Sequence, residues 1–212
     1  MANPIDRRRR DWNRFVLTSL GLLAIPAAPA WAALTRTPPQ MRGPFYPLQL
    51  PLERDNDLTR VDGMVTARGQ ITDVIGRVID TDGMPVPDVT IEIWQCNAFG
   101  RYHHPHDDAT RPLDPGFQGY GHYVTAADGG YRFRTIKPVP YPGRAPHIHF
   151  ALGGGRVEPL VTQMYVAGAP ENEQDFLLRA VRDPLQRARL LVQLEPSGDG
   201  LLARFDLVVA RR

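Results

Sequence analysis

Cysteine is almost absent from this chain. Among its 212 residues there is a single one, Cys96, so an intramolecular disulfide is excluded. It ends the run Ile93-Trp94-Gln95-Cys96, where we expect a buried, unreactive thiol rather than a nucleophile. The fold must therefore be held together by its hydrophobic core, with a bound metal as the other candidate.

A hydrophobic run long enough for a permanent membrane span is also missing. The main apolar stretch, 15–28, is short and contains Pro26. It follows the basic cluster 7–10 (RRRR) and precedes Ala30-Trp31-Ala32, whose small residues suit signal peptidase. These three parts predict an export signal peptide over 1–32, and thus a periplasmic protein without a stable membrane span after cleavage. Paired arginines favour the twin-arginine route; a basic, disordered tail is the alternative.

An excess of one charge is confined to this leader. The whole chain has 25 Lys and Arg residues against 23 Asp and Glu residues. The leader contains the arginines at 7–10 and 14 but only two acids, Asp6 and Asp11. The rest of the chain is close to neutral, which excludes the basic surface that nucleic-acid binding requires. We therefore expect no nucleic-acid partner.

Helical periodicity is scarce as well. It is confined to 172–188, where Phe176, Leu177, Ala180 and Val181 are near helical spacing. Short apolar runs separated by turn residues dominate instead, and they predict strands at 73–79, 89–94, 120–125, 131–136, 147–152, 160–166, 189–194 and 201–209. This pattern predicts an all-β fold, a β-sandwich of mostly antiparallel strands over 71–212 with one short helix. A linker and an extended N-terminal arm are expected over 33–70.

Two histidines stand out because of their spacing. His147 and His149 lie two residues apart on a predicted strand, so both rings project from one face while Ile148 and Phe150 project from the other. This geometry can place two imidazole nitrogens on one metal ion. By itself, an HxH pair is equally compatible with a structural role.

A second group of candidate ligands follows the strand that contains Trp94. Tyr102 is succeeded by His103, His104 and His106 in a loop rich in proline and aspartate, where we expect solvated histidines rather than ligands. We expect the same of His122. Taken alone, Tyr102 and Tyr141 have the character of interfacial tyrosines with a buried ring and a hydrated hydroxyl.

Four collinear segments resemble the intradiol ring-cleavage dioxygenases, especially the protocatechuate 3,4-dioxygenases. They are RGPFYP (42–47), GRVIDTDGMPVPDVTIEIWQCNAFGRYHH (76–104), DPGFQGYGHYVTAADGGYRFRTIKPVPYPGRAPHIHF (114–150) and LVTQMYVAG (160–168). The combination of GRYxH, RTIKPxPYP and HIHF is highly specific to that family. Only Pro142 and Gly143 separate Tyr141 from Arg144, fewer residues than in the protocatechuate enzymes.

The resemblance implies a mononuclear non-haem Fe(III) centre. Its ligands would be Tyr102, Tyr141, His147 and His149, of which Tyr141 and His149 match the axial positions. Arg144 and Gln163 match positions that face the substrate, and Tyr141 would also act as a base. The implied reaction uses O₂ to open a catechol-type ring between its two hydroxyls, which yields a cis,cis-muconate. Two anionic oxygen donors with imidazoles suit Fe(III) better than the thiolate sets of zinc or copper(I).

Two other interpretations stay open at this stage. The stretch 76–95 also fits a non-catalytic, exported, transthyretin-like β-sandwich that binds a ligand or a partner. An HxH site loaded with zinc or copper is the second alternative. Phe45 and Tyr46, in the arm, would allow contacts with a second copy of the chain, so a homo-oligomer is compatible with the sequence.

Overall fold

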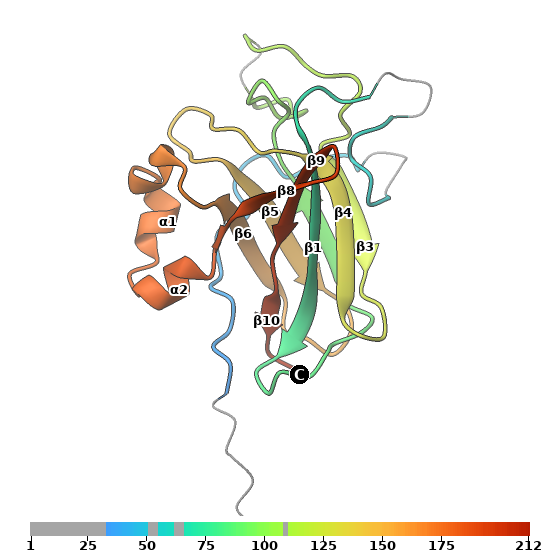
Figure 1. Ribbon diagram of the computed structural model, residues 1–212, viewed down its shortest axis with the longest axis vertical. Coiled ribbons are helices and arrows are strands. Elements are labelled where there is room, and N and C mark those ends of the chain that lie inside the picture. The colour runs from blue at the N-terminus through green and yellow to red at the C-terminus, as the bar shows by residue number, and fades with distance from the viewer. Residues whose placement is uncertain (1–32, 51–54, 62–65, 108–109) are drawn as a thin grey trace, which may run out of the picture. The chain divides into compact units, whose positions relative to one another are not determined.

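The computed structural model describes residues 33–50, 55–61, 66–107 and 110–212. The predicted signal peptide over 1–32 lies outside these residues. The described chain forms two β-sheets that pack face to face, with short helical segments beside one of them (Figure 1). The predicted all-β sandwich is confirmed. Within the described part of the chain, no helix has the length and apolar character that a bilayer span requires.

The first sheet is organised around its longest strand, β1. Its members are β1 (Ile71–Asp80), β4 (Gly130–Ile136), β8 (Leu194–Ser197), β9 (Gly200–Arg204) and β10 (Leu207–Val209). One edge of β1 pairs antiparallel with β4, and the other pairs in parallel with β9 and then β10. The predicted strand 201–209 is interrupted at Asp206, whose carboxylate accepts the backbone N–H of Arg77 at 2.8 Å. A side chain there takes the place of a backbone acceptor, so the strand divides in two.

The second sheet carries the two histidines. It consists of β2 (Thr90–Trp94), β3 (Tyr120–Val124), β5 (His147–Gly153), β6 (Leu160–Val166) and β7 (Leu191–Val192), in the order β3-β2-β5-β6-β7. Its pairs are antiparallel except for β6 with β7. β5 is therefore an interior strand with a neighbour on each side.

The main core fills the space between the two sheets. Ile148 and Phe150 of β5 point into it and are fully buried. His147 and His149 point to the opposite face, as the period of two predicts, yet only 1% and 2% of their surfaces are exposed. Something must therefore cover the outer face of this sheet as well.

The N-terminal arm provides part of that cover. The backbone N–H groups of Leu34, Thr37 and Gln40 donate to the carbonyls of Thr81, Val208 and Val161, so the segment predicted as a linker is hydrogen-bonded along the sandwich. Farther along, Phe45, Tyr46 and Leu50 pack on a second hydrophobic cluster, formed by Trp94, Cys96, Tyr102, Tyr120 and Ala151. The aromatic rings of the arm thus have partners within their own chain, and contacts with a second copy stay a prediction.

The helical region 172–188 is divided into three short pieces. These are the 3₁₀-helix η1 (Pro170–Glu173) and the α-helices α1 (Phe176–Ala180) and α2 (Pro184–Ala188). Asp175 and Asp183 have extended backbones, and their side chains accept N–H groups of the helix that follows. Each aspartate is therefore an N-cap that begins a new helix, and Pro184 is tolerated because it occupies the first turn.

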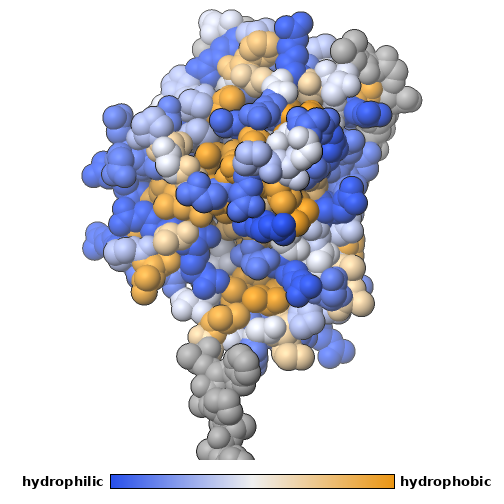
Figure 2. Space-filling model, viewed as in Figure 1, coloured by the Kyte–Doolittle hydropathy of each residue, from blue (hydrophilic) through white to orange (hydrophobic). Residues whose placement is uncertain are grey.

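The side of the molecule shown in Figure 1 is neither uniformly polar nor uniformly apolar. Hydrophobic residues gather near its middle and hydrophilic residues surround them (Figure 2).

Along β1, Ile71, Ile75 and Ile79 keep an intermediate exposure while their neighbours Val74 and Val78 are fully buried. This alternation is typical of a sheet with one face in the core.

Candidate metal centre

The candidate centre lies on the outer face of the second sheet, under the arm. β5 supplies His147 and His149, and the loop after β2 supplies Tyr102. Tyr141 precedes β5 in a tight turn. The ring centroids of Tyr102 and Tyr141 are 5.6 Å apart, those of Tyr141 and His147 are 5.5 Å apart, and those of Tyr102 and His149 are 6.3 Å apart. The structure thus brings all four predicted ligands together.

The two imidazoles face each other through their Nε2 atoms, which are 3.1 Å apart. Nδ1 of His147 lies 2.6 Å from the carbonyl oxygen of Ala145. Since a carbonyl can only accept, Nδ1 carries the proton and Nε2 of His147 presents its lone pair. Nδ1 of His149 is buried and has no hydrogen-bond partner.

Both histidines are held in the neutral form that a metal ligand requires. Burial, with the nearby Arg144 charge, lowers the pKa of His147 to about 3. Burial also lowers the pKa of His149 well below its usual value, and the charges of His147 and Arg144 act in the same direction. Two neutral nitrogens that cannot easily protonate are therefore directed at one point.

The two tyrosines differ in how their hydroxyls are satisfied. Among the described residues, the hydroxyl of Tyr102 is buried and makes no well-aligned hydrogen bond, although the phenol of Tyr141 is close to it. Burial raises its pKa well above the usual value, and the nearby Tyr141 raises it further. Burial also raises the pKa of Tyr141, although the Arg144 guanidinium opposes this effect. Without a bound metal cation, both phenols would therefore be neutral at pH 7, even beside Arg144.

A four-residue turn places Tyr141 beside Arg144. The backbone N–H of Arg144 donates to the carbonyl of Tyr141 at 2.9 Å, with Pro142 and Gly143 between them. Gly143 has a φ of +79°, a conformation that favours glycine. Proline followed by a glycine of positive φ is the residue pattern of a type II turn. The phenol and the guanidinium therefore leave the two ends of one rigid turn.

The arm fits closely around these rings. Phe45 stacks on Tyr102, with ring centroids 4.8 Å apart and an interplanar angle of 26°. Gly43 has a φ of +74°, and a Cβ added there would come within 3.4 Å of Cε1 of His149. A larger residue at this position would be strained and would crowd the imidazole, so the arm is part of the centre.

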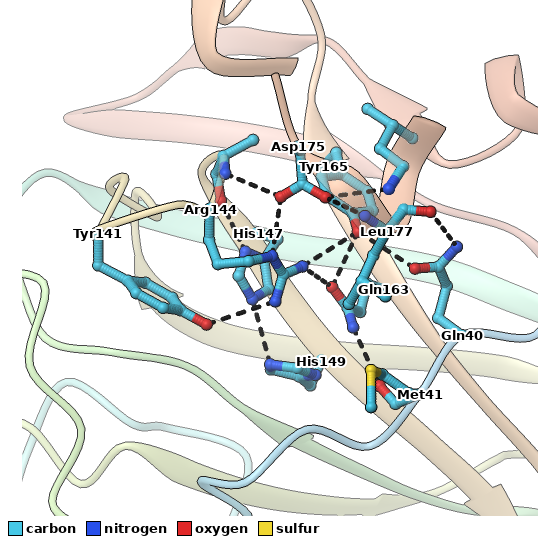
Figure 3. A network of polar contacts seen from close by, with 12 residues as sticks. Gln40, Met41, Tyr141, Arg144, His147, His149, Gln163, Tyr165, Asp175 and Leu177 are labelled. Carbon is cyan, nitrogen blue, oxygen red and sulfur yellow. Dashed lines mark hydrogen bonds and ion pairs between the residues drawn. The ribbon is translucent and has the colours of Figure 1, made fainter. Parts of the chain in front are cut away.

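Arg144 is anchored on one side by a buried carboxylate (Figure 3). Its Nε donates to Oδ2 of Asp175 at 2.8 Å, and its second terminal nitrogen donates to Gln163 Oε1 and to the Tyr165 hydroxyl. The other terminal nitrogen lies 3.4 Å from the Tyr141 hydroxyl. Burial alone would lower the pKa of Arg144, but Tyr141, Tyr165 and Asp175 raise it on balance, so the side chain keeps its charge.

Gln163 connects the centre to the arm. It is paired with His149 across β5 and β6, and its side chain donates to the carbonyl of Met41 at 3.0 Å. The neighbouring arm residue, Gln40, accepts a hydrogen bond from the Tyr165 hydroxyl at 3.2 Å. Arg144 and Gln163, which the family resemblance had singled out, therefore lie in one hydrogen-bonded network beside the histidines.

Sequence reasoning missed three members of this network, namely Gln40, Tyr165 and Asp175. Asp175 precedes the apolar residues 176–178 and is an aspartate at a helix start, which was a usable signal for an N-cap. Tyr165 shares a strand face with Gln163, and His147 is its partner on β5, so alternation along the strand would have found it. For Gln40 the sequence contains no comparable signal.

The other four histidines differ in their exposure. His103 and His106 are exposed and His122 has intermediate exposure, as predicted. His104 is buried, however, and its Nδ1 accepts the backbone N–H of His106 at 3.2 Å. Cys96 is buried as predicted, and burial raises the pKa of its thiol to about 12.

The larger hollows of the described surface do not open on the histidine pair. One of 370 Å³ is bordered by Phe45, Trp94 and the predicted ligand Tyr102. A neighbouring hollow of 460 Å³ shares Gln95 and His103 with it but contains no predicted ligand. The volume of a hollow therefore does not identify the site, because the larger of these two hollows contains no predicted ligand.

The donor set fits an iron ion. Two nitrogens that bind one first-row metal at about 2.1 Å each, at nearly a right angle, are about 3 Å apart, close to the separation of the two Nε2 atoms. The buried hydroxyl of Tyr102 also makes no well-aligned hydrogen bond among the described residues, and a cation would supply its partner. Within the described ranges, no three His, Cys, Asp or Glu residues are grouped so that they could hold a metal. A metal here would thus depend on the tyrosines.

Known proteins resemble this chain along most of its length. A family model described as dioxygenase matches residues 41–210. The protocatechuate 3,4-dioxygenase beta chain of Burkholderia cepacia is 37% identical, and the match covers the whole chain and 97% of that protein. The hydroxyquinol 1,2-dioxygenase of Corynebacterium glutamicum is 32% identical, over 68% of this chain and 55% of that protein.

A solved structure supports the same relationship. The dioxygenase domain of a dioxygenase–carbohydrate-binding protein fusion from Streptomyces sp. SirexAA-E is 31% identical and superposes with a TM-score of 0.66. The superposition covers 84% of this chain and all of that domain.

Proposed function

Since the chain belongs to the intradiol ring-cleavage dioxygenase family, we propose that it uses O₂ to open a catechol-type ring between its two hydroxyls at a mononuclear Fe(III) centre. The product would be a cis,cis-muconate. The observation that carries the proposal is the convergence of Tyr102, Tyr141, His147 and His149 beneath the arm. A module that only binds a partner has no need of two phenols and two imidazoles directed at one point.

The charges of these four groups favour Fe(III). Burial opposes ionisation of both tyrosines, so each phenolate requires a strong positive charge beside it. Two phenolates and two neutral imidazoles would offset two of the three charges of Fe(III). Zinc is a poorer fit, because its sites are built from Cys, His, Asp and Glu ligands, and the described residues contain no group of three of these that could hold a metal.

Bound Fe(III) would supply Lewis-acid chemistry, stabilising a catechol in its dianionic form at neutral pH. The chain itself must then accept the protons that the catechol releases. Tyr141 is suited to this task because its side chain is only partly buried and it begins a turn whose two central residues, Pro142 and Gly143, are exposed. We assign it the role of a base, to which one catechol proton passes.

Arg144 and Gln163 would act on the ring of the substrate. The guanidinium keeps its charge and lies beside Tyr141, where it would stabilise negative charge that develops on the ring during the reaction. Gln163 is fully buried and is held at both ends of its amide, by Met41 and by Arg144, so on the side facing the substrate it would fix the position of the guanidinium.

The substrate would be a catechol in the broad sense. The relatives named above act on protocatechuate and hydroxyquinol, and others in the family are catechol 1,2-dioxygenases. The chain spans little more than half the length of the hydroxyquinol and catechol enzymes that it matches. We propose the shared catechol unit, with O₂, as the substrates and no organic cofactor.

We further propose that the protein is exported. The leader over 1–32 has the basic cluster, apolar stretch and small residues of a signal peptide, with paired arginines typical of the twin-arginine route. Leu34, two residues beyond the predicted cleavage site, donates its backbone N–H to Thr81, so the described fold begins almost at once after it.

Metal analysis and product identification together test the proposed function. Protein purified from its native host should contain a single iron per chain and be red-brown, and a panel of catechol, protocatechuate, hydroxyquinol and alkylcatechols should yield a muconate from at least one member. Stoichiometric zinc with no visible absorption band would exclude the Fe(III) centre. Iron-loaded protein that turns over none of the panel would favour the transthyretin-like binding module. A yellow semialdehyde product would mean cleavage outside the two hydroxyls.

A further inference from the structure

Asp175 gathers more hydrogen bonds at one carboxylate than its role as a helix cap requires. Its Oδ1 accepts the backbone N–H groups of Leu177 and Leu178, at 3.0 and 2.9 Å, which begins α1. Its Oδ2 accepts Nε of Arg144 at 2.8 Å and the backbone N–H of Ala145 at 2.9 Å. One buried side chain therefore joins α1 both to the end of the Tyr141–Arg144 turn and to the guanidinium (Figure 3).

The ion pair is almost wholly removed from solvent. The side chain of Asp175 is 0% exposed and that of Arg144 is 8% exposed. A buried arginine without a countercharge is strongly disfavoured and would turn toward water. Asp175 therefore allows Arg144 to stay charged in a place where the centre can use it.

The remaining contacts of Arg144 fix its orientation about that anchor. Its second terminal nitrogen bonds to Gln163 and Tyr165, on the side away from the turn. The first terminal nitrogen is left to face the Tyr141 hydroxyl, at 3.4 Å. The bond from Nε to Asp175 holds the base of the guanidinium, and the bonds of the second terminal nitrogen oppose its rotation.

We propose that Asp175 is a positioning residue, which holds the guanidinium of Arg144 with one edge toward Tyr141 and so toward the catechol. This inference rests on the proposed function, because it assigns Asp175 a part in the same site. Among the described residues, the hydrogen bonds of Asp175 go to Arg144 and to backbone N–H groups and to none of the predicted metal ligands, so its effect on the centre would pass through Arg144.

The chain contains a matched control for the capping role alone. Asp183 begins α2 as Asp175 begins α1, and its Oδ1 accepts the backbone N–H of Leu185 at 2.9 Å. Both helices are five residues long. Asp183 is exposed, and no hydrogen bond or ion pair links its described side chain to an arginine. Asparagine caps helices as well as aspartate does, so Asp→Asn removes the charge at both sites while it keeps the cap. At position 175 the amide nitrogen would then face two donors, so the hydrogen bonds from Arg144 Nε and from the Ala145 backbone N–H are lost with the charge.

Four variants test the proposal, namely Asp175→Asn, Asp183→Asn, Arg144→Gln and the double variant of Asp175 and Arg144. Asp175→Asn should retain iron and visible colour, but kcat/KM for catechol should fall about 10²-fold, the size of effect that misplaced catalytic groups produce. It should also weaken binding of 4-nitrocatechol, titrated without oxygen and followed by the visible spectrum. Asp183→Asn should match the wild type in both measurements.

The double variant shows whether Asp175 acts through Arg144. In the Arg144→Gln background, Asp175→Asn should change kcat/KM and nitrocatechol binding by no more than about twofold, because the group that it positions is already gone. The proposal would be overturned if Asp175→Asn lowered kcat/KM by the same factor in the wild type and in the Arg144→Gln background. It would also be overturned if Asp183→Asn lowered kcat/KM as much as Asp175→Asn does.

Measurements on the metal-free protein test the positioning role independently of the proposed function. Urea unfolding of the same four metal-free variants measures the coupling between Asp175 and Arg144 without any turnover. Wild-type protein that cleaves no catechol would refute the proposed function, whereas independent effects of the two substitutions on the urea midpoint would refute the positioning role.

Discussion

Trp94 and His149 are direct partners across β2 and β5, and their rings lie almost parallel, with an interplanar angle of 4° and centroids 4.7 Å apart. The indole thus fixes the plane of an imidazole whose Nε2 faces that of His147. As a proposed metal ligand, His149 would thus depend on its neighbouring strand for its orientation as well as on its own backbone. The first prediction concerns the loss of this imidazole.

His149→Ala should abolish iron binding, because it removes a donor from a set of four without a replacement. His104→Ala is the matched control, since it also removes a buried imidazole, one that lies outside the set. Iron per chain, measured by atomic absorption after gel filtration, gives the comparison. Equal iron in both variants would show that His149 is not a ligand.

Tyr102→Phe should remove part of the visible absorption while the protein stays folded, because one phenolate would no longer donate charge into Fe(III). Tyr120→Phe is the control: its phenol is equally buried, but its hydroxyl donates to Glu92 at 2.6 Å. The visible spectrum of the control should be that of the wild type. A spectrum of Tyr102→Phe that is unchanged per iron would contradict the assignment of this ligand.

Tyr141→Phe should keep its iron through Tyr102, His147 and His149 but bind catechols more slowly. If its phenolate accepts a catechol proton, turnover should fall by about 10²–10⁴-fold, which is typical for the loss of a general base. Stopped-flow mixing with a catechol under nitrogen measures the binding step, and single-turnover cleavage measures the rest. Wild-type rates in both would remove Tyr141 from the reaction.

The stability of the sandwich should depend on pH through Asp80, at the end of β1. Burial alone would raise the pKa of Asp80, but hydrogen bonds from Arg211 and from the backbone N–H groups of Met84 and Asp82 lower it below 3.8 on balance. A lowered pKa in the folded state means that the ionised carboxylate stabilises the fold above pH 3.8 and that this contribution is lost as the pH falls below it.

Asp80→Asn should therefore cost about 1–3 kcal/mol of unfolding free energy at pH 7, the value of hydrogen bonds to a charged group. The cost should shrink as the pH is lowered toward 3, where the wild type loses the same contribution. Urea unfolding at the two pH values measures it. A difference between variant and wild type that is independent of pH would show that the charge of Asp80 has no such effect.

The mature N-terminus should be Ala33, directly after the predicted cleavage site. Replacing Arg9 and Arg10 with lysine should retain the protein in the cytoplasm, because the twin-arginine route requires both arginines. N-terminal sequencing of protein from a periplasmic fraction measures the first point and cell fractionation the second. Met1 or Ala2 at the N-terminus of the major species would refute cleavage, whereas export of the lysine variant would refute only the route.

The sequence predicted most of the strands well because their signal is local. Leu160–Val166 has the predicted bounds, and β1 to β5 differ from their predictions by at most two residues at either end. The predicted strand 189–194 was wrong in its extent, since the structure has the two short strands β7 and β8 there. Alternation along β5 also placed His147 and His149 on one face, which the structure confirms. The two tyrosines could be assigned to them only through the family resemblance, since no periodicity links three separate segments.

What the sequence could not supply are contacts between distant segments. Arg144 and Asp175 are 31 residues apart, and Gln163 and Met41 are 122 residues apart, with no shared pattern to connect either pair. For the same reason the arm was predicted to be merely extended, although it lies against His149 and Tyr102. Such pairings follow from the packing of the whole domain, which no short window contains.

The turn between Tyr141 and Arg144 bears on how such proteins can diversify. Pro142 and Gly143 are exposed, and a side chain added at Gly143 would meet nothing within 4 Å. Extra residues inserted there would extend into open space and leave every packed side chain of the sandwich in place. Related proteins could thus evolve longer loops at this turn, which would add residues around the substrate and leave the four proposed ligands unchanged.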